Sequence, residues 1–241
     1  MTRNPLVAII QARMTSTRLP GKVLMDIGGR SALELMVSRV KRATLVDGIV
    51  VATTTNATDD PVVSLCERLG IATFRGDEHD VLGRFAGAAK AHGAATVVRL
   101  TGDCPIADPA VVDDAIRLYA SGRWDYVGNA NRRTYPDGLD VEVFSRAALE
   151  RADREAAHPF AREHVTPYIR GTRRDIIPDG GFARGDLIYP ADFSHIRWTL
   201  DRQDDLERLR RLVSKLPDGF DWLSALSVAT REPSLLGLGA G

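Results

Sequence analysis

Three basic side chains follow the first apolar segment of the chain, which spans residues 6–10. They are Arg13, Arg18 and Lys22, and no acidic residue occurs in residues 1–22. Hydroxyl side chains and a Pro-Gly turn lie among them. Cations and turn amides together can hold a polyphosphate, although the spacing matches neither the P-loop nor the dinucleotide-binding glycine pattern. A solvated basic loop is the alternative, and composition alone leaves the two interpretations equally open.

Two carboxylates follow later apolar segments and could bind a divalent metal ion. Asp103 comes after Gly102 at the end of segment 95–100, and Asp201 comes directly after segment 195–200. Mg²⁺ is usually held by one or two carboxylates together with substrate phosphates. Asp103 could equally bond its own backbone in a turn. For Asp201 taken alone, the role of helix N-cap is favoured, and a carboxylate with two oxygens can fill both roles.

These groups can act together only if the segments before them are strands of one sheet. Strands are predicted at residues 6–10, 48–54, 71–74, 95–100 and 125–127, and helices separate them. Ser31 with Glu34 forms a capping box at one helix start, and Pro109 begins another helix after Asp108. The alternation predicts an α/β fold, a mostly parallel sheet with helices on both faces. Ligands bind beyond the carboxyl ends of such strands.

The alternation changes after residue 129. We expect a turn at 136–138, a strand at 139–144, helices at 145–155 and 160–170, and loops at Gly180, Gly181 and Gly185. A strand at 195–200 and two helices follow. We therefore predict one domain over residues 1–241. It comprises a nucleotide-binding half at 1–128, an inserted subdomain at 129–200 and C-terminal helices at 201–241.

The composition narrows the classes of partner. The 241 residues hold 32 Lys+Arg and 32 Asp+Glu, so the formal net charge is zero. Binding to a nucleic-acid polymer or to a membrane surface usually needs a basic surplus, so neither partner is expected. The two cysteines lack metal-ligand spacing, and the first apolar run is too short for a secretory signal. A cytoplasmic protein is therefore expected.

Seven segments of the chain resemble one known family. They are IIQARMTSTRLPGKVL at 9–24, VVATTTNATDD at 50–60, FRGDEHDVLGRF at 74–85, VVRLTGDCPIADP at 97–109, TYPDGLDVEVFS at 134–145, REHVTPYI at 162–169 and RWTLD at 197–201. Together they closely resemble the cytidylyltransferases of the spore-coat polysaccharide SpsF type, relatives of the CMP-sialic acid and CMP-Kdo synthetases. The resemblance covers nearly the whole chain, and its first and fourth segments together are highly specific.

The resemblance implies a Rossmann-like nucleotide-diphospho-sugar transferase fold of the GT-A type. It implies that CTP and an acidic sugar, of the nonulosonic or octulosonic acid type, give a CMP-sugar and pyrophosphate for surface polysaccharide synthesis. Mg²⁺ is then expected on Asp103 and Asp201, and the expected catalytic residues are Arg13, Lys22, Asp103 and Asp201. The expected nucleotide-binding residues are Gln11, Ala12, Arg13, Arg18, Lys22, Thr54, Arg75, Asp80, Arg84 and Thr101. The expected acceptor-binding residues are Asn129, Tyr135, Asp137, Asp140, Glu142, Glu163 and His164.

Structural roles stay open for several of these residues. Thr54 could lie in a loop before a helix, Asp80 could cap a helix, Asp137 could form a hairpin turn, and His164 could pack or cap. The resemblance also implies a homodimer paired through residues 125–195. Metal activation or a carboxylate such as Asp140 could take the place of a dedicated general base. Residues 128–131, Gly-Asn-Ala-Asn, depart from the family's usual Ser-Asn pair near the acceptor, which leaves the sugar open.

Other functions fit parts of the pattern. A glycosyltransferase on the same fold would use a nucleotide-sugar donor, with Asp-Val-Glu at 140–142 as a degenerate metal motif. A cytidylyltransferase could also act on a non-sugar acceptor such as a phosphonate or a polyol. A non-catalytic nucleotide-binding protein is the third alternative. The basic segment 13–22 fits a free triphosphate better than a diphospho-sugar, and the intact acidic and basic residues argue against a loss of catalysis.

Overall fold

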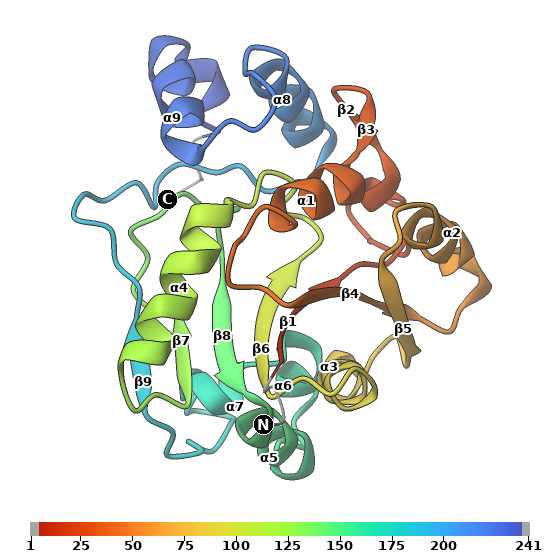
Figure 1. Ribbon diagram of the computed structural model, residues 1–241, viewed down its shortest axis with the longest axis vertical. Coiled ribbons are helices and arrows are strands. Elements are labelled where there is room, and N and C mark those ends of the chain that lie inside the picture. The colour runs from red at the N-terminus through yellow and green to blue at the C-terminus, as the bar shows by residue number, and fades with distance from the viewer. Residues whose placement is uncertain (1–4, 238–241) are drawn as a thin grey trace.

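Seven strands form one mixed sheet in the computed structural model, which describes residues 5–237 (Figure 1). The strand order is β5-β4-β1-β6-β8-β7-β9. The first four of these strands are parallel, β8 runs antiparallel between β6 and β7, and β9 pairs in parallel with β7. The bounds are β1 Leu6–Gln11, β4 Gly48–Thr54, β5 Ala72–Gly76, β6 Thr96–Thr101, β7 Tyr126–Gly128, β8 Glu142–Ser145 and β9 Arg184–Asp186.

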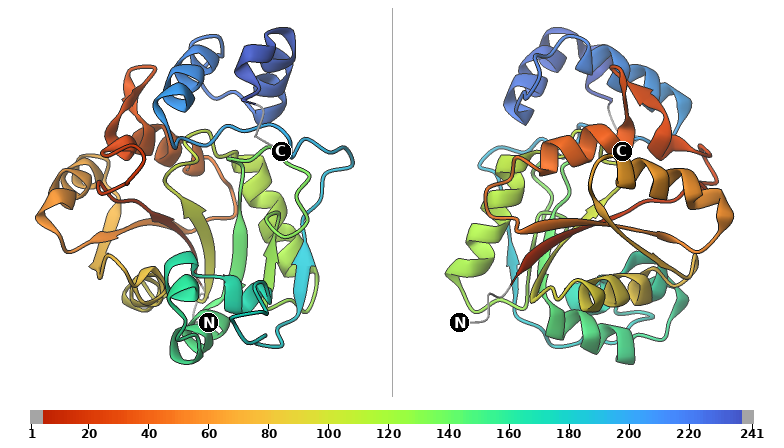
Figure 2. Two further views of the ribbon diagram at one scale, coloured as in Figure 1. Left: turned by 180° about the vertical axis from the view of Figure 1, so that it is seen from behind. Right: turned by 45° about the vertical axis from the view of Figure 1, so that its right-hand side comes forward.

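Helices cover both faces of this sheet, as Figure 2 shows. Successive strand side chains point to opposite faces, so Ala8 and Ile10 of β1 enter one core while Val7 and Ile9 enter the other. Helices α1, α2 and α4 contribute to the first core, and α3 and α5–α7 to the second. The bounds are α1 Ala32–Val40, α2 Asp60–Arg68, α3 Val81–Ala91, α4 Pro109–Ser121, α5 Arg146–Glu155, α6 Pro159–His164, α7 Pro167–Arg170, α8 Gln203–Val213 and α9 Trp222–Arg231.

Short elements complete the connections near the carboxyl ends of the strands. The 3-10 turn η1 and the hairpin β2–β3 lie between β1 and α1, and α8 packs beside β2. Two further 3-10 turns, η2 and η3, precede α2 and follow α9. The bounds are η1 Lys22–Leu24, β2 Asp26–Ile27, β3 Arg30–Ser31, η2 Ala57–Asp59 and η3 Pro233–Leu235.

Local signals in the sequence predicted several elements well. The strand expected at 48–54 is β4, and α1 is capped as expected, with the Ser31 hydroxyl accepting a hydrogen bond from the Glu34 amide at 3.2 Å. Helix α4 begins at Pro109, and the Asp108 carboxylate accepts the Ala110 amide at 2.9 Å. These elements form where they do because caps and apolar periodicity agree there.

Four sequence-based predictions after residue 129 were wrong in whole or in part. Segment 195–200 is not a strand: its backbone forms an isolated bridge between Asp137 and Arg197, while Trp198 and Leu200 fill the core from an extended loop. The helix expected at 160–170 is two short helices, because the chain turns at Val165, where φ is +69°. Gly185, expected in a loop, lies inside β9. Strand β8 also begins later than the expected residue 139.

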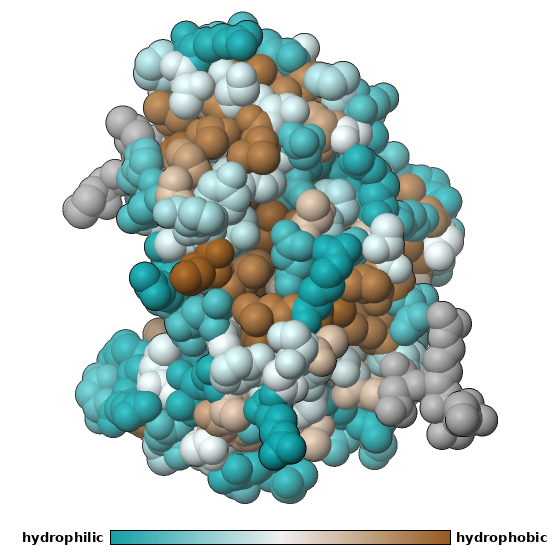
Figure 3. All heavy atoms as spheres, turned by 60° about the vertical axis from the view of Figure 1, so that its left-hand side comes forward, coloured by the Kyte–Doolittle hydropathy of each residue, from teal (hydrophilic) through white to brown (hydrophobic). Residues whose placement is uncertain are grey.

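Hydrophilic side chains interrupt the apolar surface on the face shown in Figure 3. The large apolar side chains that are exposed are scattered along the chain, at Leu45, Ile176, Ile188 and Leu223. Isolated residues of this kind are ordinary for a globular protein. Within residues 5–237, no helix has the length and apolar character that crossing a bilayer requires.

Candidate active site

A pocket of about 400 Å³ lies at the carboxyl ends of β1 and β6. This is the sheet edge where the sequence placed the ligand. The pocket brings together many residues that were predicted from separate segments. They are Gln11, Ala12, Arg13, Arg18, Lys22, Arg84, Thr101, Asp103, Glu163, His164 and Asp201.

Lys22 joins the two predicted metal ligands at the centre of the pocket. Its Nζ lies 2.9 Å from Asp201 Oδ1 and 3.3 Å from Asp103 Oδ2. A left-handed turn at Gly21, with φ at +74°, starts η1 and places Lys22 there. The Leu200 amide donates to the Asp103 carbonyl oxygen at 2.7 Å, which ties the two carboxylate-bearing loops together. Residues far apart in sequence therefore converge on one point.

Asp201 is surrounded by positive charge. Arg18 reaches Oδ1 at 2.7 Å, and Arg197 reaches Oδ2 at 2.7 Å. Burial raises the pKa of this carboxyl, but the hydrogen bond and charge of Lys22, with the charges of Arg18 and Arg197, more than offset it, so the pKa lies below the ordinary 3.8. Asp201 is therefore ionised at neutral pH. The N-cap of α8 is Arg202, so the Asp201 carboxylate does not serve as the helix cap.

The donor chemistry of this pair suits a divalent cation. Two carboxylates already converge on the ammonium of Lys22, so their oxygens can face a single positive charge. Within residues 5–237, no group of three or more His, Cys, Asp or Glu side chains could hold a metal ion. A site with two carboxylates and remaining positions for water and phosphate oxygens is the arrangement that Mg²⁺ favours.

Further cations line the same pocket. Arg13 pairs with Glu78 at 3.2 Å, and Arg84 donates to the Asp77 carbonyl at 2.7 Å. Burial lowers the pKa of the Arg84 guanidinium, and the nearby charge of Arg13 lowers it further. Like charges gathered in one partly buried pocket repel one another, and an anionic ligand relieves that repulsion. The pocket is therefore suited to a polyphosphate.

Arg99 is a pocket residue that the sequence reasoning did not select. It donates to Gln11 Oε1 at 3.1 Å and pairs with the buried carboxylate of Glu142. Within residues 5–237, its Nε has no hydrogen-bond partner. The available signal was an arginine inside the otherwise apolar segment 97–100, because charge on a buried strand needs a partner.

Glu142, predicted to bind the acceptor, lies beneath the pocket rather than on its wall. Besides Arg99, it accepts the hydroxyls of Tyr126 at 2.8 Å and Thr166 at 2.7 Å, and Arg170 lies 3.6 Å away. Burial raises the pKa of Glu142, but the charges of Arg99 and Arg170 and these hydrogen bonds outweigh burial and lower it. In the structure, Glu142 holds Arg99 in place.

Three residues predicted to bind the nucleotide lie outside the pocket lining. The Thr54 hydroxyl donates to Asp59 Oδ2 at 2.6 Å, in a cluster that also binds the Met14 amide. Arg75 pairs with Asp60 at 2.7 Å. Asp80 caps α3 and pairs with Arg162. These contacts are structural, and a role in nucleotide binding stays a prediction for each.

The predicted acceptor residues are divided between the pocket and its surroundings. Glu163 and His164 line the pocket, where burial lowers the pKa of His164. The Asn129 side chain bonds the backbone at Leu139 and Val141, and Tyr135 packs on the aromatic rings of Tyr189 and Trp222.

Asp137 and Asp140 lie outside the pocket lining and share one basic partner, Arg133, at 3.4 and 2.9 Å. Burial raises the pKa of Asp140, and the charge and hydrogen bond of Arg133 only partly offset that shift. Arg197 also lies 3.7 Å from Asp137, so it links this pair to Asp201. Arg197 is a second site residue that the sequence reasoning did not select.

A family model described as cytidylyltransferase matches residues 7–213. The chain belongs to the cytidylyltransferase family. This cytidylyltransferase is 35% identical over 217 residues to the spore coat polysaccharide biosynthesis protein SpsF of Bacillus subtilis, with 88% of each chain covered. It is 30% identical to the 3-deoxy-manno-octulosonate cytidylyltransferase of Geobacter sulfurreducens, with 94% of this chain and 88% of that one covered. It also matches uncharacterized protein MJ1063 of Methanocaldococcus jannaschii at 42% identity, over 68% of this chain and 66% of that protein.

Solved structures support the same assignment. A cytidylyltransferase from Leptospira borgpetersenii is similar with a TM-score of 0.90 and 32% identity, over 99% of both chains. A CMP-2-keto-3-deoxy-manno-octonic acid synthetase shares the fold, with a TM-score of 0.64 and 19% identity over 88% of this chain and 99% of that one. The predicted family, the enzyme class and the GT-A-like α/β fold are therefore confirmed.

Proposed function

We propose that this cytidylyltransferase couples CTP to an acidic sugar, of the nonulosonic or octulosonic acid type, and releases pyrophosphate. The observation that carries the proposal is the meeting of Lys22 with Asp103 and Asp201 inside a cation-rich pocket. Nucleotidyl transfer needs such a site, because negative charge builds both on the α-phosphate and on the leaving group during the reaction.

The transfer balances without a redox partner. An acceptor hydroxyl oxygen forms a bond to the α-phosphorus of CTP, and the bond from that phosphorus to the bridging oxygen breaks. Pyrophosphate leaves with the bonding electrons, and the hydroxyl proton is released. We assign Arg18 and Lys22 to the charge of the leaving pyrophosphate, and Arg13 to the nucleotide. Asp103 and Asp201 would hold Mg²⁺, which when bound neutralises phosphate charge and lowers the pKa of the attacking hydroxyl.

An acidic acceptor fits the remaining charges of the pocket. Arg99 lines it in addition to the residues expected to bind the nucleotide, and a carboxylate can pair with a guanidinium in a bidentate way. The curated relatives include a spore coat polysaccharide biosynthesis protein and a 3-deoxy-manno-octulosonate cytidylyltransferase, which supports a sugar acid over a phosphonate or a polyol.

Pyrophosphate release tests the proposal directly. The protein is incubated with CTP, Mg²⁺ and a panel of sugar acids, sugars, polyols and phosphonates. We expect release only when CTP, Mg²⁺ and a sugar acid are all present, and Asp103→Asn or Asp201→Asn should reduce turnover about 100-fold or more. Asp114→Asn, on the exposed face of α4, is the matched control and should leave turnover unchanged. Turnover with a polyol or phosphonate alone, or consumption of a nucleotide-sugar without pyrophosphate release, would overturn it.

A further inference from the structure

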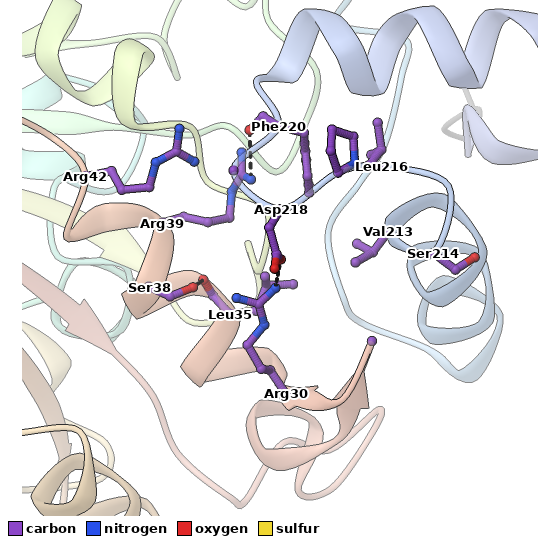
Figure 4. Close-up of a pocket in the computed structure, with 13 residues that line it drawn as sticks. Arg30, Leu35, Ser38, Arg39, Arg42, Val213, Ser214, Leu216, Asp218 and Phe220 are labelled. Atoms are coloured by element: carbon purple, nitrogen blue, oxygen red, sulfur yellow. Dashed lines mark hydrogen bonds and ion pairs between the residues drawn. The ribbon is translucent and has the colours of Figure 1, made fainter.

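A second pocket, of about 560 Å³, lies away from the candidate active site, between α1, the end of α8 and the loop at residues 216–220 (Figure 4). Gly28, in the turn between β2 and β3, also lines it. Its volume is in the range of pockets that take small molecules. None of the roles assigned above to the nucleotide or the acceptor uses it.

Three arginines line this second pocket. Arg30 pairs with Asp218 at 2.6 Å. Arg39 is buried, donates to the carbonyl oxygens of Ala107 at 2.8 Å and Phe220 at 3.0 Å, and lies over the Phe220 ring. Within residues 5–237, Arg39 Nη2 has no hydrogen bond, and its nearest acidic partner, Asp108, lies 3.6 Å away.

Arg42 lies on the same wall as Arg39, one turn of chain further on. Arg42 is exposed, and across the described residues its side chain makes no ion pair and donates no hydrogen bond. Burial lowers the pKa of Arg39 to about 10, Asp108 opposes that shift, and Arg42 adds to it. Arg39 still carries its charge at neutral pH, so three guanidinium groups gather around one cavity, where only two of them have a carboxylate partner among residues 5–237.

The one acidic side chain on the pocket wall is a weak competitor for these donors. The Asp218 side chain is 90% exposed, and its pair with Arg30 is therefore screened by solvent. A phosphate group offers several oxygens to guanidinium forks and carries more charge than a carboxylate. Leu35, Val213 and Leu216 line the rest of the cavity and suit an uncharged organic body.

The walls of this pocket continue into the candidate active site along three segments. The chain runs from Lys22 through η1 to Gly28 and Arg30, which line the second pocket. The loop after β6 runs from Asp103 to Ala107, whose carbonyl oxygen accepts a hydrogen bond from Arg39. Asp201 immediately precedes α8, whose last residue, Val213, lines the pocket. Each of these walls is therefore joined by a short stretch of chain to Lys22, Asp103 or Asp201.

We propose that this pocket is a second ligand site, which binds the phosphate group of a small phosphorylated metabolite through Arg30, Arg39 and Arg42, and that its occupancy changes the affinity of the active site for CTP. Asp218 releases Arg30 when the ligand enters. Arg39 also holds the α1, Ala107 and Phe220 segments together, so the test uses Arg30 and Arg42 instead.

Thermal unfolding with inorganic phosphate as the probe tests the site. At 50 mM phosphate, against sodium chloride of the same ionic strength, we expect the melting temperature to rise by about 3 °C. The rise should persist in Arg18→Gln/Lys22→Met, which weakens the active site, and should be lost in Arg30→Gln/Arg42→Gln. Arg123→Gln/Arg154→Gln removes the same charge from exposed positions and should keep it. A rise that survives Arg30→Gln/Arg42→Gln, or that Arg18→Gln/Lys22→Met abolishes, would overturn the second site.

CTP titration with and without phosphate tests the coupling. Phosphate also competes with CTP at the active site, and that competition is the same in the wild type and in Arg30→Gln/Arg42→Gln. We expect the effect of phosphate on the Kd for CTP to differ about fivefold between these two proteins. Equal effects would overturn the coupling. Neither readout depends on the acceptor, so a failure of the proposed sugar transfer would leave both results interpretable.

Discussion

Lys22 is nearly buried, although lysine is rarely so, and two carboxylates account for it. The carboxyl ends of parallel strands meet at one sheet edge, which explains why Lys22 and Asp103 could be placed there from the sequence. Asp201 reaches the same edge from a loop, although its predicted strand was wrong. It could not predict Arg99 or Arg197, because their partners, Glu142 and Asp201 with Asp205, are set by tertiary packing rather than by a local motif. Glu142 was wrongly expected in the acceptor pocket because the alternating polarity of its strand does not show which residues pack against each side chain.

The ion pair of Glu142 with Arg99 should be a main determinant of stability around the site. Glu142→Gln leaves the largely covered charge of Arg99 without its buried partner, which costs about 3 kcal/mol of unfolding free energy. Denaturant unfolding checks this. Glu150→Gln, which removes the exposed partner of Arg146, is the control and should change stability by less than about 0.5 kcal/mol. Equal small effects for both variants would show that Arg99 does not depend on Glu142.

Elements with strong local signals formed as predicted, and elements that depend on distant partners did not. Ser31, Asp108 and Pro109 fix helix starts through contacts within a few residues. Segment 195–200 has apolar residues typical of a strand, but its backbone amides donate to carbonyl oxygens of loops. Leu200 donates to Asp103, and Trp198 donates to Asp137. The same loop contacts bring Asp201 to Asp103, so the failed strand prediction and the assembled site have one cause.

The contact between the end of β1 and the loop after β6 should be sensitive to a single methyl group. A Cβ at Gly102 would lie 2.8 Å from the Gln11 carbonyl oxygen. Gly102→Ala should therefore displace the neighbouring Asp103, lower stability by about 1–3 kcal/mol and lower kcat/KM about 10- to 100-fold. At Gly48, a Cβ meets nothing within 4 Å, so Gly48→Ala is the control, with both quantities nearly unchanged. Normal activity of Gly102→Ala would mean that the loop adapts freely.

The zero net charge of the whole molecule conceals a strong separation of charge. Cations concentrate after β1, and carboxylates follow β6 and segment 195–200, so both meet in one pocket. That arrangement suits a single nucleotide rather than a nucleic-acid polymer. The predicted pairing of two chains through residues 125–195 stays a prediction.

The pH dependence of stability follows from carboxylates that are ion-paired or hydrogen-bonded in the folded chain. Their pKa values lie below the ordinary 3.8 for Asp201 and Asp59 and below 4.5 for Glu142, so protons bind more readily to the unfolded chain. The stabilisation is complete above the ordinary values and is lost as the pH falls through the lower folded values. Asp140 acts in the opposite sense, because burial raises its pKa. We expect the unfolding free energy to fall slightly from pH 7 to about 5, because the lowered pKa of His164 makes the unfolded chain bind that proton more readily, and to fall steeply below about 4. A constant value down to pH 3 would contradict these shifts.

Calorimetric titration of CTP in the presence of Mg²⁺ tests the central claim that the pocket at Lys22 is the nucleotide site. The wild type should bind CTP at this site, and Lys22→Met should weaken the binding about 100-fold, because an interaction with the triphosphate is lost while Asp103 and Asp201 keep their charges. Lys90→Met, at an exposed position on α3, should bind CTP as the wild type does. If Lys22→Met bound CTP with unchanged affinity, the assignment of this pocket to the nucleotide would be wrong.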